Sequence, residues 1–235
     1  AKYDFRLGAA ITDFAINRFW LHEEVDFYFV GHDELRHQIH KADNKAEIIA
    51  TGIPIDPLFN EVGEVPKHIL RQKIGFQEQP PTLLLMGGGM GLGPLDRLIE
   101  KMIAEFNDTL QLIVVTGRNE WLRKKCETTY RNHASIHVFG YVDNLPHMIA
   151  ACDLIVTKPG GLTSSEALAM GLPMLIIEPI PGQEERNSRF LLAQRVALRV
   201  NEVAHICRYI RPFIEDPHFY ESFKVRARRA GKPDS

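Results

Sequence analysis

The stretch that decides the fold runs from Asp153 to Asn187 and is DLIVTKPGGLTSSEALAMGLPMLIIEPIPGQEERN. A short apolar run at 154–156 breaks at the Pro-Gly-Gly of 159–161, after which alanine, leucine and methionine recur at helical spacing. A second apolar run at 173–177 follows a glycine of the kind that ends helices. The pattern predicts one βαβ unit: a strand, a tight turn, a helix starting near Thr163 and a second parallel strand.

The turn at 159–161 is the first candidate binding site. Its glycines let backbone amides approach a ligand closely, and the start of the helix presents unpaired N–H groups and a positive dipole end, so a phosphate is the expected occupant. Glu166, one turn into the helix, is then placed to accept hydrogen bonds from a ribose. The same residues also fit a capping box, Thr163-x-x-Glu166, in which the glutamate only satisfies the first helical amide. From the residues alone both interpretations stand.

Composition bounds the class of protein. The 235 residues are 45% hydrophobic, enough for one large or two small globular domains. The 28 basic and 30 acidic residues give a net charge of -2, which provides no general attraction to nucleic acid or anionic membranes. The three cysteines are far apart and form no CxxC pair, which indicates neither a disulfide framework nor a zinc site and suits a reducing cytosol. No apolar run approaches the roughly 18 residues of a membrane span. The first residues are no secretory signal.

The front of the chain predicts an incomplete domain. Short strands are expected at 8–11, 26–30 and 47–50, with a polar helix at 34–41. The turn-rich segment 51–59 then leads into a linker, and about a quarter of the chain is too little for a full α/β domain. Because Ala1 is not an initiator methionine, we expect the chain to be part of a longer protein.

The remainder predicts a doubly wound parallel sheet. Apolar runs near 82–86, 110–115, 136–139, 154–156, 173–177 and 197–200 alternate with helical patterns. Three of the intervening turns carry glycine with polar or basic residues: GGGMGLG at 87–93, TGRN at 116–119 and KPGGLT at 158–163. The glycine-rich loop is neither G-x-G-x-x-G nor a Walker motif, and alone it is as often packing as binding. Since the carboxyl ends of parallel strands share one edge, the three turns together favour a nucleotide site.

Four ordered motifs resemble the carboxyl-terminal donor domain of glycosyltransferase family 28, in its group of monogalactosyldiacylglycerol synthases and processive diacylglycerol glucosyltransferases. They are LLLMGGGMGLG at 83–93, TGRNE at 116–120, the stretch 139–176 and PGQEERN at 181–187. TDF at 12–14 and VDFYFV at 25–30 resemble the end of the family's amino-terminal domain. The resemblance implies a GT-B architecture of two Rossmann-like domains. Residues 1–59 would be the remnant of the acceptor-side domain with its linker, and 60–235 the UDP-sugar-binding domain.

The resemblance also implies a site with no metal. The donor diphosphate would be held by Gly88, Gly89, Met90, Gly91, Arg118, Pro159, Gly160, Gly161, Leu162 and Thr163. Uracil would lie against Gly140, Tyr141 and Val142, the ribose on Glu166, and the sugar hydroxyls on Gln183, Glu184 and Asn187. Taken by themselves, Arg118 fits a diphosphate partner or a surface arginine, and PGQEERN fits a sugar-binding turn or a solvated loop before a helix.

The activity implied is an inverting transfer of a hexose from UDP-glucose or UDP-galactose to a lipid acceptor such as diacylglycerol, in glycolipid biosynthesis. Such a protein would be cytoplasmic and peripheral at the inner face of the cell membrane, with no resident cofactor and no nucleic-acid partner. Asp13 is the acidic candidate for general base within a front-segment motif, and Asn17 stands where family members often carry histidine. The alternatives are a UDP-sugar-binding fragment without turnover and a nucleotide-sugar epimerase of related fold.

Overall fold

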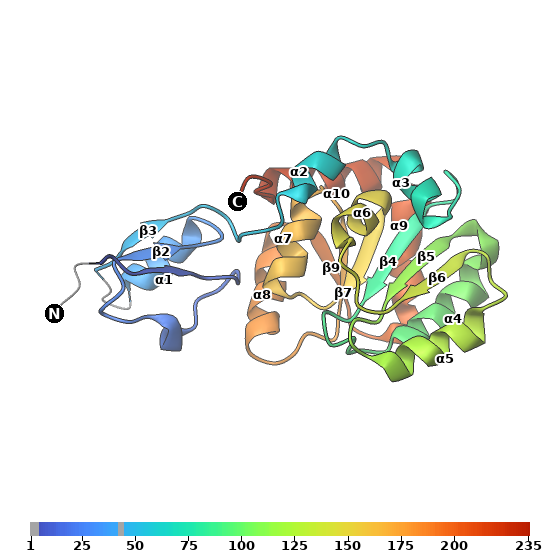
Figure 1. The fold of residues 1–235 in the computed structure, drawn as a ribbon, viewed down its shortest axis with the longest axis horizontal. Helices are drawn as coiled ribbons and strands as arrows, with labels where there is room; N and C mark the ends of the chain where they lie inside the picture. The colour runs from blue at the N-terminus through green and yellow to red at the C-terminus, as the bar shows by residue number, and fades with distance from the viewer. Residues whose placement is uncertain (1–4, 42–44) are drawn as a thin grey trace.

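The computed structural model describes residues 5–41 and 45–235, which form a small and a large lobe (Figure 1). The small lobe contains a parallel sheet in the order β1 (Gly8–Ala10), β2 (Phe27–Phe29) and β3 (Glu47–Ile49), with α1 (Glu34–His40) between the last two strands and a 3-10 turn, η1 (Arg18–Trp20). Its core is completed by side chains such as Val30, Leu35 and Ile39, none of which is exposed. The three strands and the helix expected from the sequence are confirmed.

The large lobe is built on six parallel strands. They are β4 (Thr82–Met86), β5 (Gln111–Val115), β6 (Ile136–Phe139), β7 (Leu154–Thr157), β8 (Met174–Ile177) and β9 (Ala197–Val200). Their order in the sheet is β6-β5-β4-β7-β8-β9, and every neighbouring pair is parallel. The prediction of a doubly wound parallel sheet is therefore confirmed.

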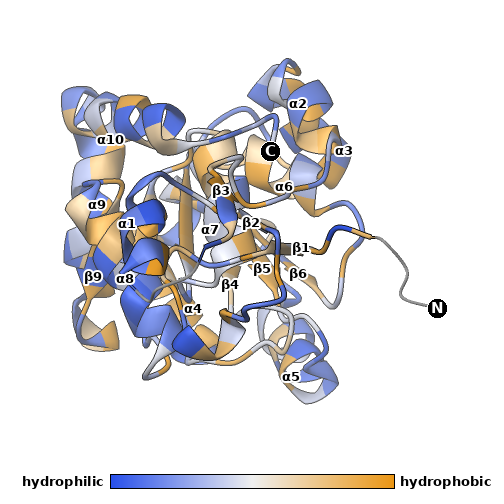
Figure 2. Cartoon of the chain, turned by 90° about the vertical axis from the view of Figure 1, so that its left-hand side faces the viewer, coloured by the Kyte–Doolittle hydropathy of each residue, from blue (hydrophilic) through white to orange (hydrophobic). Residues whose placement is uncertain are grey.

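Helices cover both faces of this sheet because successive side chains of a strand point to opposite sides. Leu83 and Leu85 pack with α4 (Leu95–Phe106), α5 (Glu120–Tyr130) and α9 (Ile206–Glu215). Leu84 and Met86 pack with α6 (Leu145–Ala151), α7 (Gly161–Ala169) and α8 (Gln183–Ala193). With both faces covered, the four inner strands β5, β4, β7 and β8 are buried throughout and almost entirely apolar, whereas the edge strands β6 and β9 include the half-buried His137 and Arg199. Helices such as α2, α5 and α10 alternate between hydrophilic and hydrophobic residues (Figure 2).

The segment after residue 57 is not an extended linker. It forms α2 (Leu58–Gly63) and α3 (Lys67–Ile74), and both helices contact α6 of the large lobe. At the other end of the chain, β9 is followed by η3 (Val203–His205), α9 and α10 (Pro217–Ala230). A further 3-10 turn, η2 (Asn107–Thr109), follows α4. Ser235 Oγ donates to the Ile53 carbonyl at 2.7 Å, so the last residues return to the segment between the lobes.

The strand order creates one switch point. From β4 the chain winds outward through β5 to β6, and from β7, which pairs with β4, it winds the other way through β8 to β9. The helices that follow β4 and β7 therefore leave on opposite faces. In open α/β sheets, the carboxyl ends of two such strands border the crevice in which ligands bind.

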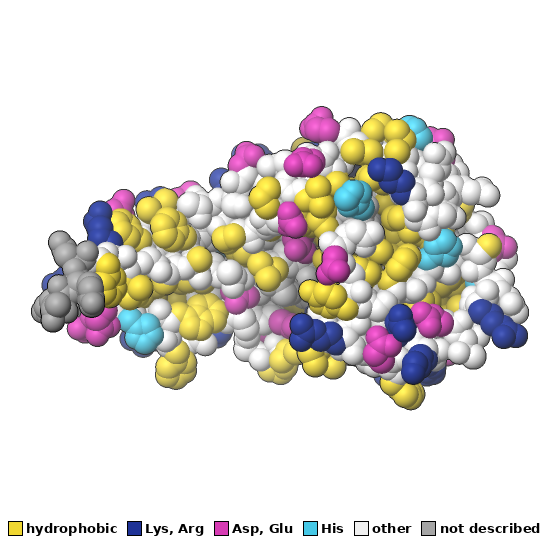
Figure 3. All heavy atoms as spheres, viewed as in Figure 1, with side chains coloured by type: hydrophobic (Ala, Val, Ile, Leu, Met, Phe, Trp, Pro, Cys, Tyr) yellow, Lys and Arg dark blue, Asp and Glu magenta, His cyan; other side chains and the backbone are white. Residues whose placement is uncertain are grey.

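The charge pattern of the surface does not indicate a particular kind of binding partner. On the face seen in Figure 3, acidic and basic side chains are interspersed rather than gathered into fields of one sign. Within the described part of the chain, every helix falls short of the length and apolar character that crossing a bilayer requires.

A buried ion network fixes the opposite edge of the sheet. Arg71 of α3, only 4% exposed, donates from Nε to the Ala151 carbonyl at 2.9 Å, and its Nη2 pairs with Asp153. Asp153 also accepts from Lys67 Nζ and from the Thr82 amide, each at 2.9 Å. Burial by itself would raise the pKa of Asp153, but the charges of Lys67 and Arg71 outweigh it and hold that pKa below its usual range.

We expect Asp153→Ala to lower the free energy of unfolding by about 3 to 5 kcal/mol, because it leaves Arg71 buried without a counter-charge. Asp96→Ala is the matched control, since Asp96 pairs with the partly exposed Lys125 and its loss should cost no more than about 1 kcal/mol. Urea unfolding of both variants measures the difference. Equal losses would show that the Asp153 network does not hold α3 to the sheet.

Candidate functional site

Two of the predicted turns are in direct contact at the switch point. The loop 87–93 is a tight turn in which the Gly91 amide donates to the Gly88 carbonyl at 2.9 Å. It packs on the turn after β5, because the Arg118 amide donates to the Gly89 carbonyl at 3.0 Å and Asn119 Nδ2 donates to the Gly91 carbonyl at 3.2 Å. The third turn follows β7, the neighbour of β4, so all three border the same crevice.

Backbone amides around this crevice have no acceptor within the protein. Among the described residues, the N–H groups of 161–163 at the start of α7 and of 88–90 in the glycine-rich loop make no hydrogen bond. A Cβ built on Gly89 or Gly160 would meet no atom within 4 Å, so both glycines border open space. Free N–H groups on a helix tip and an adjacent turn are the arrangement that binds phosphate.

Gly91 differs from its neighbours in the loop. Its φ is +60°, and a Cβ built there would lie 1.8 Å from the Thr116 carbonyl oxygen. This glycine is required by the packing of the two turns on each other, whereas Gly88 and Gly89 leave the ligand side open.

The capping-box interpretation of Glu166 is wrong. The helix α7 begins at Gly161, two residues earlier than expected, and Gly160 occupies the cap position without a side-chain hydrogen bond. Thr163 is therefore the third helical residue, and Glu166 lies in the second turn. The Glu166 carboxyl forms no hydrogen bond or ion pair with any residue that the structure describes. Burial, with a smaller contribution from the nearby Asp56 carboxyl, raises its pKa to about 7. A half-buried carboxyl without a partner is suited to accept from ligand hydroxyls.

The cationic and aromatic side chains of the site lie at its exposed rim. The Arg118 guanidinium lies 5.6 Å from the ring centroid of Tyr141, and that ring is 62% exposed. The backbones of Tyr141 and Val142 make no hydrogen bond within the described chain, which leaves their polar groups free for a flat base. The sequence analysis missed Lys158, whose Cε would be 3.7 Å from a Cβ on Gly93. Its position directly after β7 is the signal that could have identified it.

The PGQEERN segment is not a solvated loop, because it forms the first turns of α8. Glu184 accepts from the Ile180 amide at 2.7 Å and so fixes the turn before the helix. Gln183 accepts from Arg186 Nη2 at 2.9 Å and donates to the Ala15 carbonyl of the small lobe at 3.4 Å. Both side chains are half-buried.

Asn187 lies deeper than the sugar contact implied by the resemblance. Its side chain has no exposed surface, and its Nδ2 donates to Asp13 Oδ1 at 2.6 Å and to the Pro159 carbonyl at 3.1 Å. Its Oδ1 accepts from the Phe14 amide at 2.9 Å. A sugar hydroxyl would have to replace one of these bonds.

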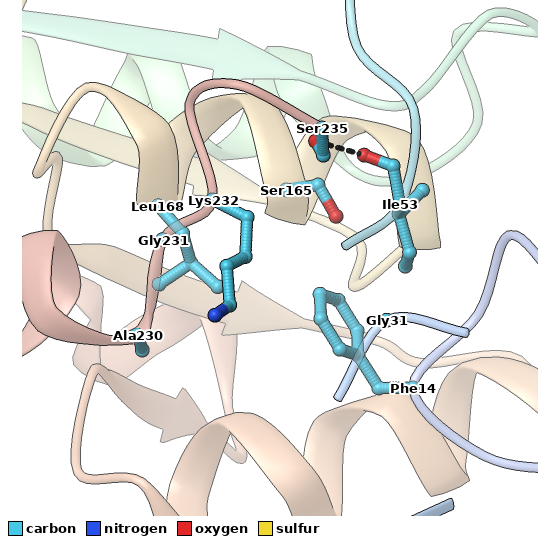
Figure 4. Close-up of a pocket in the computed structure, with 9 residues that line it drawn as sticks. All are labelled: Phe14, Gly31, Ile53, Ser165, Leu168, Ala230, Gly231, Lys232 and Ser235. Carbon is cyan, nitrogen blue, oxygen red and sulfur yellow. Dashed lines mark hydrogen bonds between the residues drawn. The ribbon is translucent and has the colours of Figure 1, made fainter. Parts of the chain in front are cut away.

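The junction of the lobes is closely packed. The Phe14 ring stacks on Phe190 of α8 at a centroid distance of 4.6 Å, and His32 Nε2 donates to the Phe14 carbonyl at 3.1 Å. The cavity shown in Figure 4 lies between Phe14, Ser165 and the chain's last residues, and its volume is about 10 Å³. That is room for no more than one water molecule, so the junction is a contact and not a ligand pocket.

A doubly wound parallel lobe joined to a second parallel α/β lobe is the architecture of the GT-B class of proteins. Residues 82–204 match the model of the glycosyltransferase family 28 C-terminal domain, and residues 7–55 match that of monogalactosyldiacylglycerol (MGDG) synthase. The chain belongs to glycosyltransferase family 28.

Curated relatives and solved structures agree with this assignment. A processive diacylglycerol beta-glucosyltransferase of Bacillus pumilus is 30% identical over 217 residues, which are 91% of this chain and 56% of the relative. One of Bacillus subtilis is 31% identical over 224 residues, 92% and 58% of the two chains. The chain thus spans a little over half the length of these relatives. Acinetobacter baumannii MurG, at 14% identity, has a TM-score of 0.67 over 98% of this chain and 64% of its own, a likeness of fold.

The pKa of Glu166 predicts a pH-dependent effect on stability. Because folding raises this pKa from an ordinary 4.5 to about 7, the stability it contributes is fully present below pH 4.5 and is lost as the pH rises through 7. We expect Glu166→Gln to melt about 3 °C above the wild type at pH 8 and close to it at pH 5. Thermal unfolding at the two pH values tests this, with the exposed Glu64→Gln as control. A shift independent of pH would contradict the burial of an ionisable Glu166.

Proposed function

We propose that this chain forms the donor-binding part of a hexosyltransferase that moves glucose or galactose from a UDP-sugar to a diacylglycerol-type lipid at a membrane surface, in glycolipid biosynthesis. The family and the names of the relatives support the reaction class. The observation that carries the proposal is that the turns after the neighbouring strands β4 and β7 both present unbonded amides, with the unpartnered Glu166 carboxyl in the second turn of α7.

The donor would lie across the crevice with its uracil near 140–142 and its hexose toward α8. Its diphosphate would accept from the amides of 88–90 and 161–163, with Arg118 and Lys158 supplying positive charge. The ribose hydroxyls would donate to Glu166, and uracil would bind to the free backbone at 140–142. The hexose would then extend toward the beginning of α8, where Gln183 and Glu184 offer amide and carboxylate groups.

The reaction is a substitution at the anomeric carbon. The oxygen of the acceptor hydroxyl forms a bond to that carbon as the bond to the diphosphate oxygen breaks, so UDP leaves with the electron pair and the configuration inverts. The hydroxyl proton passes to a general base, for which Asp13 is the candidate. Amides and cations fixed around the diphosphate stabilise the charge that develops on the leaving group. No resident cofactor is part of this proposal.

Two other functions use the same crevice. Because the chain spans 56% of the Bacillus pumilus relative, it could bind donor without turning it over. A UDP-GlcNAc 2-epimerase from Neisseria meningitidis shares the fold, with a TM-score of 0.66 at 18% identity over 89% of this chain and 58% of its own. Family membership favours transfer over epimerisation.

Binding of UDP and of 2′-deoxy-UDP tests the ribose role of Glu166. At pH 8, where Glu166 with its pKa of about 7 is mostly ionised, we expect the wild type to bind UDP about tenfold more tightly, because a hydrogen bond to a charged acceptor contributes about 1.5 kcal/mol. Glu166→Gln should weaken UDP and lose most of this discrimination, whereas Glu64→Gln should keep it. Calorimetric titrations of the three proteins with the two nucleotides measure all six dissociation constants. A Glu166→Gln variant that still discriminates fully between the two nucleotides would remove Glu166 from the ribose site.

Incubation of labelled UDP-glucose or UDP-galactose with diacylglycerol vesicles separates transfer from binding. Labelled glycolipid supports the transferase, and Asp13→Asn should then reduce its formation by at least about 100-fold, as loss of a general base does. UDP binding without glycolipid supports a donor-binding part that needs more of the protein. Conversion of one UDP-sugar into an epimer, with no lipid product, would identify an epimerase.

A further inference from the structure

One contact between the lobes lies at the crevice itself. The segment 12–14 of the small lobe meets the first residue of α7, where a Cβ built on Gly161 would lie 1.9 Å from the Thr12 carbonyl oxygen and 3.0 Å from Asp13 Oδ1. The Asp13 carboxylate is therefore beside the amino-terminal tip of the helix that carries the free amides. A negative charge is favoured at that tip, and so is the phosphate of a ligand.

Asn187 is the group that keeps the carboxylate there. Its amide nitrogen bonds both Asp13 at 2.6 Å and the Pro159 carbonyl at 3.1 Å, so one NH₂ group joins the small lobe to the turn before α7. Its oxygen accepts from the Phe14 amide at 2.9 Å, which fixes the direction of the segment. All three bonds are formed by a side chain with no exposed surface, so solvent does not compete for them.

We propose that Asn187 is a positioning residue: by holding the Asp13 carboxylate against the tip of α7, it makes the small lobe part of the anion site and limits how tightly a diphosphate binds there. The inference rests on the proposed function, since it takes UDP as the anion. It assigns Asn187 a role through Asp13, in place of a direct contact with the donor sugar.

The charge balance at the tip explains the direction of the effect. The free amides of 161–163 and the helix dipole attract one negative charge, and Asp13 already supplies one. A diphosphate that binds beside the carboxylate meets a like charge at short range. Such a site releases UDP more readily than an unoccupied helix tip would, while it keeps the carboxylate close to the reacting end of the donor.

A double-mutant cycle tests this without requiring turnover. The variants are Asp13→Asn, which removes the charge and keeps an oxygen that can accept from Asn187, Asn187→Ala, and the two combined. UDP and UDP-glucose are titrated into each by calorimetry. We expect Asp13→Asn to bind UDP about threefold more tightly than the wild type, as the loss of a like charge near a helix terminus predicts. Asn187→Ala should tighten UDP binding in the wild-type background and have no effect in the Asp13→Asn background.

Each of the other possible titration results would contradict the inference for a different reason. If Asn187→Ala weakens UDP-glucose but not UDP in both backgrounds, Asn187 is a sugar ligand. If it weakens both ligands equally in both backgrounds, its role is only structural. If UDP binding is indifferent to Asp13→Asn, the carboxylate is not part of the anion site, although the proposed function stands. If no variant binds UDP, the proposed function fails as well.

Folding is followed separately, because Asn187→Ala removes three buried hydrogen bonds. Asn187→Ser retains a smaller hydrogen-bonding side chain and serves as the second variant if the alanine form does not fold. The Phe14 amide donates a hydrogen bond to the Asn187 side-chain oxygen. Its hydrogen exchange should therefore be faster in either variant than in the wild type. Unchanged exchange there would show that Asn187 does not fix the segment, and would overturn the inference independently of any ligand.

Discussion

The site depends on one topological constraint, which is that β4 and β7 lie side by side while the connections that follow them leave on opposite faces of the sheet. The turns after these strands form no backbone hydrogen bond with each other, and the backbone amides at 88–90 and 161–163 have no acceptor within the described chain. An unsatisfied amide in a closed interior costs about 1 to 3 kcal/mol. Such groups persist only where water or a ligand reaches them, and the crevice provides that access.

Groups that stabilise the lobe and groups that are available to a ligand lie at opposite ends of β4 and β7. At the amino-terminal ends of β4 and β7, the largely buried Asp153 carboxylate accepts hydrogen bonds from two cations, Arg71 and Lys67, and from the Thr82 amide. At the carboxyl ends, Glu166 is half-buried with its charge unmatched, and burial raises its pKa to about 7. The paired charges at the amino-terminal ends of the strands hold the lobe together. The unpaired Glu166 carboxyl at the carboxyl ends is available to a ligand.

The sequence was informative where structure follows from local pattern. Every strand of the large lobe was predicted, because a strand buried on both faces must be a continuous apolar run between glycine and proline breaks. The start of α7 lies two residues earlier than the sequence predicts because Gly161, a residue of low helix propensity, is itself the first helical residue. The role of Asn187 was out of reach, since its partner Asp13 is 174 residues away and only the assembled lobes bring them together.

The Pro-Gly-Gly turn shows why binding and lobe contact cannot be independent. A Cβ on Gly160 would meet no atom, so this glycine faces the crevice, whereas one on Gly161 would collide with the Thr12 carbonyl, so the next glycine faces the small lobe. The Pro159 carbonyl completes the turn by accepting from Asn187. Three consecutive residues thus border open space, contact the neighbouring lobe and accept from a buried amide. Any movement of the small lobe must displace the backbone that lines the crevice, and a ligand in the crevice must in turn bias the position of the lobe.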